Sequence, residues 1–244
     1  MLTLKNICWT LPDGEEILKG IDLTVQTGKL TIVTGPNGGG KTSLAKLVSG
    51  LEHPTSGEIW LDNVDITDKN ITERAKLGVS YAFQQPVQFK GLTVRDLLKL
   101  SAGGELQEDR LCSILGKVGL CTQDYIDREV NASLSGGEIK RIEIATVLAR
   151  KDRKLAIFDE PEAGIDLWSF AGLVDVFERL KRKGTETLLV ISHQERLLNI
   201  ADDIVVVANG KVRAAGPREE ILPQLLADEK AGSCPIGKEI QGDE

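Results

Sequence analysis

The sequence predicts an α/β fold with a largely parallel sheet, and three observations lead to this prediction. Short apolar runs alternate with helical patterns in residues 1–91 and again in residues 150–226, as in strand–helix–strand units. A glycine-rich segment stands between the apolar run 30–33 and a helical pattern that ends at Gly50. Residues 92–149 have helical periodicity, which predicts a helical subdomain inserted into a single domain.

The first quarter of the chain predicts a further layer of strands. Residues 2–8 and 17–25 have strand patterns and flank the turn Pro12-Asp13-Gly14. Another strand pattern covers residues 57–62, just after the first helix. Several strands around a single helix suggest an N-terminal antiparallel β subdomain beside the parallel core.

The remaining elements are predicted from periodicity and from turn residues. Asn209-Gly210 between two apolar runs is a strong hairpin signal. After residue 226 the chain becomes charged and contains glycine, so residues 227–244 are predicted to form a loose C-terminal tail. The expected strands cover residues 78–83, 155–158, 186–191, 204–208 and 211–215, and the expected helices cover residues 94–100, 109–118, 136–149, 167–182 and 195–200.

Composition narrows the class of function. The formal net charge is −7, which disfavours nonspecific binding to nucleic acid. The sequence has no apolar run of about 18 residues and no signal-peptide core at its start, so we expect a cytoplasmic location. No two cysteines have C-x-x-C spacing, which predicts free thiols rather than a zinc site or a redox dithiol. The four cysteines are Cys8, Cys112, Cys121 and Cys234.

The glycine-rich segment carries the strongest chemical signal. It fits G-x-x-x-x-G-K-[ST], the phosphate-binding loop, and it has the strand before it and the helix after it that this loop requires. Backbone N–H groups and the helix N-terminus would bind a polyphosphate. Lys41 would reach the β- and γ-phosphates of ATP, and the Thr42 hydroxyl would ligate Mg²⁺. The expected ATP-binding residues here are Gly35, Pro36, Asn37, Gly38, Gly39, Gly40, Lys41, Thr42 and Ser43.

Two carboxylates follow the apolar strand at residues 155–158. Ligands of α/β sheets bind where strands end, so Asp159 is expected to hold Mg²⁺. Glu160 is expected to orient or deprotonate the attacking water. An Asp-Glu pair is also common on protein surfaces, but this pair directly follows four apolar residues. Together with the phosphate loop, the pair predicts a P-loop NTPase core.

A second glycine-containing segment, residues 134–138, begins a predicted helix. Ser135 can cap the helix and Glu138, three residues later, completes a capping box. The same geometry leaves free N–H groups at a positive helix end, which can bind an anion. The structural and the ligand-binding interpretations are compatible. Ser135, Gly136, Gly137 and Glu138 are therefore candidate anion-binding residues.

The order of these segments resembles that of the ATP-binding-cassette (ABC) ATPases, and the resemblance covers nearly the whole chain. It implies that Gln84 contacts Mg²⁺ and the attacking water. It also implies that Asp166, in the loop 163–166, contacts a partner subunit at the ATP site, and that His193 lies near the γ-phosphate as a catalytic residue. Without the resemblance, His193 is a lone histidine with an ordinary structural role.

The resemblance further implies a dimer. Two copies of the chain pack head to tail, and residues 134–138 of each copy cap the ATP that the other copy's phosphate loop holds. A second helix N-terminus would enclose the γ-phosphate and stabilise charge in the transition state. ATP would then hold the closed state together, and hydrolysis would release it.

Within the family, three stretches resemble the ATPase of the SUF iron–sulfur cluster assembly system. They are residues 82–87, 135–144 and 192–198; the second has Glu138 where transporters have glutamine. This resemblance implies a SufB-like scaffold as partner, bound through the helical subdomain and the segment around Gln84. The alternative is the motor of a membrane importer, in which a permease would bind the same surface. In both cases the chain hydrolyses ATP with Mg²⁺.

Overall fold

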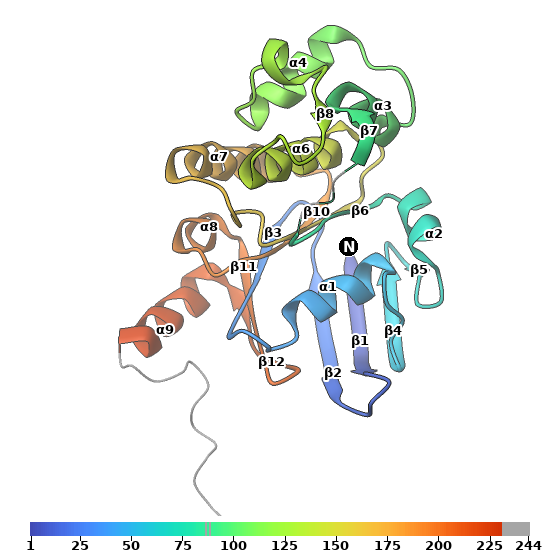
Figure 1. Ribbon diagram of the computed structural model, residues 1–244. Helices are drawn as coiled ribbons and strands as arrows, with labels where there is room; N and C mark the ends of the chain where they lie inside the picture. Colours follow the sequence, from blue (N-terminus) through green and yellow to red (C-terminus); the bar gives the residue numbers. More distant parts are fainter. Residues whose placement is uncertain (86, 88, 231–244) are drawn as a thin grey trace, which may run out of the picture.

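The computed structural model describes residues 1–85, 87 and 89–230 (Figure 1). Its centre is a 6-stranded sheet with the order β12-β11-β3-β10-β9-β6. All neighbouring pairs are parallel except β11 and β12, which form the hairpin predicted at Asn209-Gly210. The α/β class with a largely parallel sheet is confirmed. The strands are β3 (Leu30–Thr34), β6 (Val79–Ala82), β9 (Leu155–Asp159), β10 (Thr187–Ile191), β11 (Asp203–Ala208) and β12 (Lys211–Pro217).

A second sheet, with the order β2-β1-β4-β5, is antiparallel throughout. Helix α1 (Lys41–Ser49) packs its apolar side chains into the same hydrophobic cluster as this sheet and one face of the central sheet. The antiparallel layer therefore covers the helix that begins at the phosphate loop. Its strands are β1 (Leu2–Thr10), β2 (Glu16–Val25), β4 (Ser56–Leu61) and β5 (Val64–Asp65).

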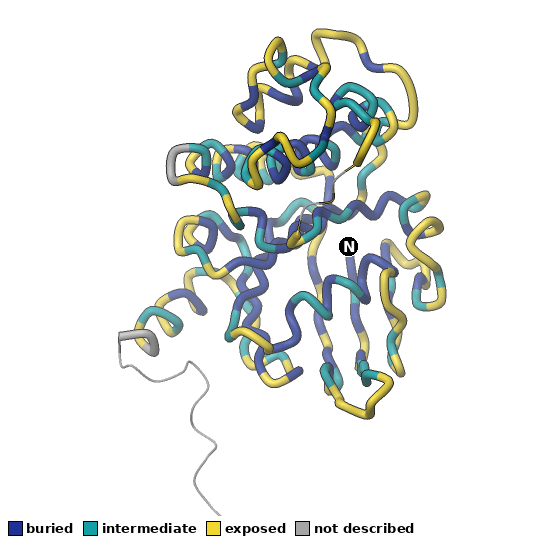
Figure 2. Tube along the Cα trace, in the orientation of Figure 1, coloured by how far each residue is buried: buried dark blue, intermediate teal, exposed yellow. Residues whose placement is uncertain are grey.

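Helices cover the other face of the central sheet and form a second hydrophobic cluster with it. Figure 2 shows buried chain running through both layers, with exposed chain mainly in loops and outer helix faces. The covering helices are α3 (Val94–Ala102), α4 (Glu108–Lys117), α5 (Thr122–Tyr125), α6 (Gly136–Ala149), α7 (Leu167–Lys183), α8 (Glu195–Ile200) and α9 (Arg218–Lys230).

The central strands are apolar on both faces because both faces are covered. Leu188 and Val190 of β10 pack with the helices, whereas Leu189 and Ile191 pack with α1 and the antiparallel sheet. Such strands have continuous apolar runs instead of alternating patterns. This arrangement explains why short apolar runs were good predictors of the central sheet.

Strand register brings the ends of four parallel strands to one edge of the sheet. Ile191 is opposite both Val33 and Asp159, and Phe158 is opposite Ala82. The segments after β3, β6, β9 and β10 therefore leave the sheet side by side. These are the phosphate loop and the segments that contain Gln84, Glu160 and His193.

Several elements differ from the sequence-based expectation, which contains neither strand β5 nor helix α5. Helix α2 (Ile71–Lys76) was not predicted; it begins with a capping box between Asn70 and Glu73. Strands β7 (Phe89–Thr93) and β8 (Glu129–Val130) form a small sheet beside and within the helical region. Helix α9 was also not predicted.

Because α9 continues to Lys230, residues 227–230 are helical instead of the first part of a loose tail. Residues 231–244, with Cys234, lie outside the described residues. Over the described part of the chain, no helix has the length and apolar character needed to span a membrane.

Candidate nucleotide site

The phosphate loop is held by close backbone packing. Gly35 has a φ of 133° and lies against the Val207 carbonyl, where a Cβ atom would clash. The Nζ atom of Lys41 donates hydrogen bonds of 2.8 Å to the carbonyl oxygens of both Gly35 and Pro36. Burial lowers the pKa of Lys41, while the charges of Glu160 and Asp159 oppose that shift. The ammonium group is therefore positioned over the loop and faces two carboxylates.

The N-terminus of α1 is open to an anion. Its capping residue is Gly40, which has no side chain to accept from the first N–H groups, and the first turn contains no acidic residue. Helix α6, which also has glycine residues in its first turn, differs in having a side-chain cap. Unpaired N–H groups and the helix dipole favour a phosphate at the start of α1.

Asp159 is the centre of a small network of oxygen atoms at the end of β9. Its carboxylate is fully buried, and it accepts hydrogen bonds from Tyr81 Oη at 2.9 Å and from Thr42 Oγ1 at 3.3 Å. Burial raises the pKa of Asp159, and these two hydrogen bonds oppose the rise. Burial also raises the pKa of Tyr81, followed by the charge of Asp159. Tyr81 is not among the predicted site residues, because it belongs to no sequence motif and has the pattern of an ordinary aromatic residue in a strand.

The oxygen atoms of Thr42 and Asp159 fit Mg²⁺, a hard cation that binds oxygen and retains water and phosphate ligands. No group of three or more His, Cys, Asp or Glu side chains suited to a metal is present among the described residues. A site with few protein ligands is typical of Mg²⁺ in nucleotide enzymes, because the phosphates supply the others. The residues present are therefore compatible with Mg²⁺ bound together with a nucleotide.

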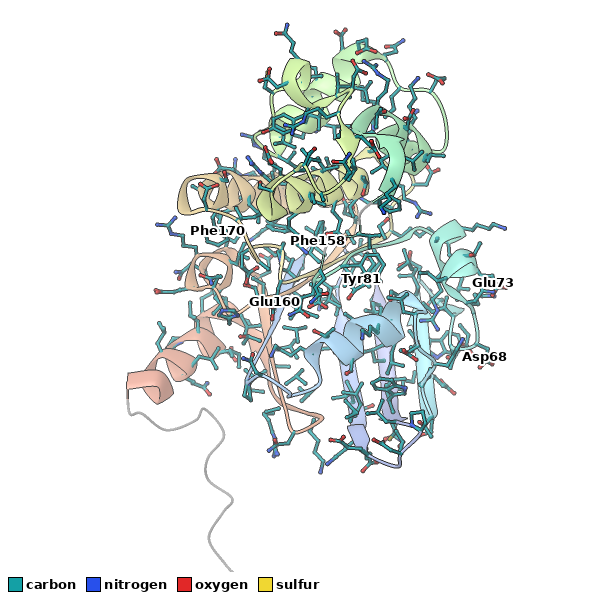
Figure 3. The ribbon with its side chains drawn as sticks, in the orientation of Figure 1. Asp68, Glu73, Tyr81, Phe158, Glu160 and Phe170 are labelled. Carbon is teal, nitrogen blue, oxygen red and sulfur yellow. The ribbon has the colours of Figure 1, made fainter. Side chains whose placement is uncertain are left out.

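Glu160 lies beside Asp159 and contacts Gln84. The Gln84 Nε2 atom donates to Glu160 Oε2 at 2.8 Å, and the backbone N–H of Glu160 donates to the Ile191 carbonyl at 3.0 Å. Glu160 has a φ of 44°, a left-handed conformation that is unusual for a glutamate and is concentrated at functional sites. Figure 3 shows Tyr81 and Glu160 in the layer between α6 and α1.

Glu162 is a further acid, partly buried, that motif analysis did not select as a site residue. Its Oε1 atom accepts a hydrogen bond of 2.6 Å from Ser192 Oγ, and its Oε2 atom has no partner among the described residues. Burial raises the pKa of Glu162, while the Ser192 hydrogen bond and the charge of His193 oppose the rise. His193 itself is exposed at the end of β10. Glu162 thus lies close enough to His193 and to Glu160 for the charge of each to affect its pKa.

Helix α6 is tied to the segment around Gln84 by a buried ion pair. Lys140 has no exposed surface, and its Nζ atom donates to the carbonyl oxygens of Phe83, Gln84 and Asp159. Glu143 lies 3.4 Å from that ammonium group and accepts from the Phe83 N–H at 2.7 Å. Residues 83 and 84 are therefore held by the helix that begins at residues 135–138.

The start of α6 confirms the predicted capping box. Ser135 Oγ accepts from the Glu138 N–H at 3.2 Å, and Glu138 Oε2 accepts from the Ser135 N–H at 2.6 Å. Glu138 also accepts from the Tyr125 hydroxyl. Gly137 lies against Gly164, where a Cβ atom would be 2.7 Å from the carbonyl oxygen. Asp166 accepts from the Ser169 N–H at 3.0 Å at the start of α7.

The sequence profile of the ABC transporter family matches residues 18–163. The chain belongs to the ABC transporter family of ATP-binding proteins. It is an ATPase domain of that family, and its described part contains the phosphate loop, the Asp159-Glu160 pair and the glycine-containing helix start expected from the resemblance.

Individual relatives agree with this assignment. An uncharacterized ABC transporter ATP-binding protein of Methanocaldococcus jannaschii, MJ0035, is 42% identical over 216 residues, which cover 85% of this chain and 86% of the relative. The energy-coupling factor transporter ATP-binding protein EcfA1 of Mesomycoplasma hyopneumoniae is 33% identical over 95% of this chain and 86% of its own length. A probable branched-chain amino acid transport protein of Archaeoglobus fulgidus, LivG, is 32% identical over 86% of this chain and 87% of its own length.

Solved structures show the same fold. A nucleotide-free ATP-binding cassette from an ABC transporter has a TM-score of 0.81 and 30% identity over 98% of this chain and 99% of its own length. The cassette MJ0796, in a dimeric post-hydrolysis state bound to ADP and Pi, has a TM-score of 0.80 and 23% identity over 89% of this chain and 99% of its own length. The latter likeness is one of fold.

Proposed function

We propose that this chain is the ATP-hydrolysing subunit of a membrane transporter of the importer class. The observation that carries the proposal is the convergence of Lys41, Thr42, Asp159 and Glu160 at one edge of the sheet, beside a cleft suited to a partner. Support also comes from relatives of similar length whose names describe transport, including EcfA1 and LivG. None of the relatives reported above carries a name from iron–sulfur assembly.

The roles of the site residues follow from their positions. Lys41 and the backbone N–H groups at the start of α1 bind the β- and γ-phosphates. Thr42 and Asp159, with Gln84, would hold Mg²⁺, which would neutralise phosphate charge. Glu160, held by Gln84, orients the attacking water and accepts its proton. His193, which follows the end of β10, is proposed as a catalytic residue near the γ-phosphate.

The second anion-binding helix end serves the ATP of another copy. Within one chain, α1 and α6 pack in separate hydrophobic clusters on opposite faces of the central sheet. Residues 135–138 contact residues 164–165 of the same chain at the start of α6. In the proposed head-to-tail dimer, Ser135, Gly136, Gly137 and Asp166 face the nucleotide of the partner copy. ATP then stabilises the closed dimer and hydrolysis reopens it.

A cleft of about 220 Å³ between α2, β6, α3 and α6 is the proposed docking site for the permease. Ile71 lines this cleft and is 42% exposed, and Leu100 is 67% exposed beside Ser101, which also lines it. Phe83 and Tyr81 form part of the wall. An amphipathic helix of a partner could cover these apolar side chains. Lys140 and Glu143 of α6 bind the backbone of Phe83 in the docking cleft, and Lys140 also binds the carbonyl oxygen of Asp159 at the ATP site. These contacts connect the two sites.

Fractionation of the native complex tests the importer proposal. We expect the chain to purify from membranes together with a polytopic membrane protein. Leu100→Glu should abolish that association and leave ATP binding unchanged, whereas Val64→Glu, at a residue that is 41% exposed on β5, should leave both unchanged. If the membrane protein still associates with both the Leu100→Glu and the Ile71→Glu variants, the cleft is not the docking site.

The second candidate is the ATPase of SUF-type iron–sulfur assembly with a SufB-like scaffold. One observation favours it: α6 carries Glu138, Lys140 and Glu143, the pattern that resembles that group, and all three side chains have structural contacts. The same purification decides between the candidates. A partner in the soluble fraction that binds iron and sulfide after anaerobic reconstitution would establish assembly and overturn import.

A further inference from the structure

A cavity with a concentrated positive charge lies between α4, the end of α6 and α7, away from the phosphate loop. Its volume is about 290 Å³, and seven of its ten lining residues are arginine or lysine. No lining residue is acidic, although the whole chain carries a net charge of −7. In Figure 1, α4 and α7 lie on the side of the central sheet opposite α1.

Two of the arginines in the cavity wall have hydrogen-bond or ion-pair partners within the chain. Arg153 pairs with Glu186 at 2.7 Å and donates to the last carbonyl oxygens of α6, which belong to Val147 and Leu148. Arg150 donates to the carbonyl oxygens of Val79 and Ala75. Burial lowers the pKa of Arg150, and the neighbouring charge of Arg153 also lowers it, against an opposing effect of Asp152. These contacts hold both guanidinium groups in place, and Glu186 balances the charge of Arg153. The net positive charge of the cavity therefore comes from Arg150 and the five remaining cations.

The other five cationic side chains have no ion pair or side-chain hydrogen bond within the described part of the structure. They are Arg110 and Lys117 of α4, Lys151 of the following segment, and Arg179 and Lys183 of α7. Lys117 and Lys183 end their helices, where a cation is favoured by the helix dipole. Lys151 directly follows the C-terminal end of α6, where the same effect applies. The dipole does not explain Arg110 or Arg179. Like charges around one cavity repel each other unless an anion lies among them.

We propose that this cavity is a binding site for a small multivalent anion with phosphate-type groups, separate from the nucleotide site. Arginine forks match the oxygen atoms of phosphate and carboxylate groups. The volume is near the lower limit of small-molecule sites, about 300 Å³, so it suits a compact ligand with two or more negative groups. Arg150 and Arg153 position the ligand, and the five exposed side chains close around it.

Calorimetric titration with inorganic pyrophosphate tests the site. The full chain is saturated with ADP in EDTA, so that the phosphate loop is occupied. We expect one pyrophosphate per chain, bound more weakly as salt increases because ionic contacts are screened. Lys151→Ala combined with Arg179→Ala should weaken binding by at least about tenfold, since two charged contacts with the anion are lost.

A matched control removes the same charge elsewhere. Lys211→Ala combined with Arg213→Ala changes one lysine and one arginine on β12, both exposed and outside the cavity. This control should bind pyrophosphate within about twofold of the unchanged chain. Lys41→Ala should also retain pyrophosphate binding, because its loss affects only the phosphate loop.

Three results would overturn the proposal. They are the absence of pyrophosphate binding to the ADP-loaded chain, an equal loss of binding in the cavity and control variants, and loss of binding in Lys41→Ala. A further arm separates a soluble ligand from a lipid headgroup. Binding to vesicles of phosphatidylglycerol and phosphatidylcholine, with none to pyrophosphate, would assign the surface to a membrane and overturn the site for a small soluble anion.

Discussion

The side-chain amide of Gln84 donates a hydrogen bond of 2.8 Å to the carboxylate of Glu160. The two residues end neighbouring parallel strands, β6 and β9, which are far apart in the sequence. The amide does not give up its proton to this carboxylate, and it fixes one carboxylate oxygen while the other remains available to a water molecule. A donor in this position suits a base that must be oriented before it acts.

Glu160→Gln should reduce hydrolysis and preserve ATP binding. A glutamine oxygen can still accept from Gln84, so the local geometry is retained, but the amide cannot take a proton. Loss of a general base costs about 10²–10⁴ in rate. We expect phosphate release to fall by this factor, and size-exclusion chromatography to show an ATP-dependent dimer. Normal hydrolysis would remove Glu160 as the base, and a monomer with ATP bound would contradict the composite site.

Tyr81→Phe should weaken the response to Mg²⁺. The substitution removes the hydrogen bond that holds one oxygen of Asp159 and leaves the ring in place. Groups that orient a metal ligand contribute about 10–100-fold to metal affinity, so the Mg²⁺ concentration for half-maximal ATPase activity should rise by about tenfold. Tyr125→Phe, which removes the other tyrosine hydroxyl, is the control. If the dependence of ATPase activity on Mg²⁺ is unchanged in Tyr81→Phe, Tyr81 does not contribute to Mg²⁺ binding.

Lys140→Met should destabilise the fold, since it leaves Glu143 buried without its cation. Removing one partner of a buried ion pair costs about 3–5 kcal/mol. The double variant Lys140→Met with Glu143→Gln should lose less than the sum of the two single variants, with a coupling energy of about 0.5–3 kcal/mol. Urea unfolding of all four chains measures this difference.

Arg196→Met serves as a control for that cycle, because Arg196 is an exposed cation on α8, and it should change stability by about 0.5 kcal/mol or less. Additive losses in the cycle would show that Lys140 and Glu143 act independently. The Lys140 contacts with Phe83, Gln84 and Asp159 would then be the main contribution of this side chain.

Glu162→Gln should stabilise the chain at pH 8 more than at pH 5. Burial raises the pKa of Glu162 above its ordinary value of 4.5, so the folded chain binds this proton more tightly than the unfolded chain. The carboxyl group therefore favours folding at low pH and loses that contribution as pH rises through the raised pKa. A buried unpaired polar group costs about 1–3 kcal/mol, so a gain on the order of 1 kcal/mol is expected.

Thermal unfolding at several pH values measures this effect. For a chain of this size, 1 kcal/mol corresponds to a rise in Tm of about 2–4 °C. Glu195→Gln, at an exposed residue of α8, should leave the pH profile unchanged. A uniform gain at every pH would mean that Glu162 is not the titrating group.

Much of the site could be predicted because its signals are local. The capping box of Ser135 and Glu138 spans four residues, and the sequence shows both partners. The phosphate loop needs glycine at a strand–helix junction, which is also visible within a few residues. Helix α6 was predicted with the bounds that the structure has, Gly136–Ala149. Family resemblance then selected Gln84, Asp166 and His193, which the residue types alone do not distinguish.

The sequence by itself determined the fold class, the phosphate loop and the two acids at the end of β9, because each depends on residues that are neighbours in the chain. Tertiary structure alone decided which distant side chains meet. Tyr81 contacts Asp159, Lys140 lies under Gln84, and Arg110 shares a cavity with Lys183. These contacts depend on strand register and helix packing, which join segments many residues apart and leave no periodic or local trace in the sequence.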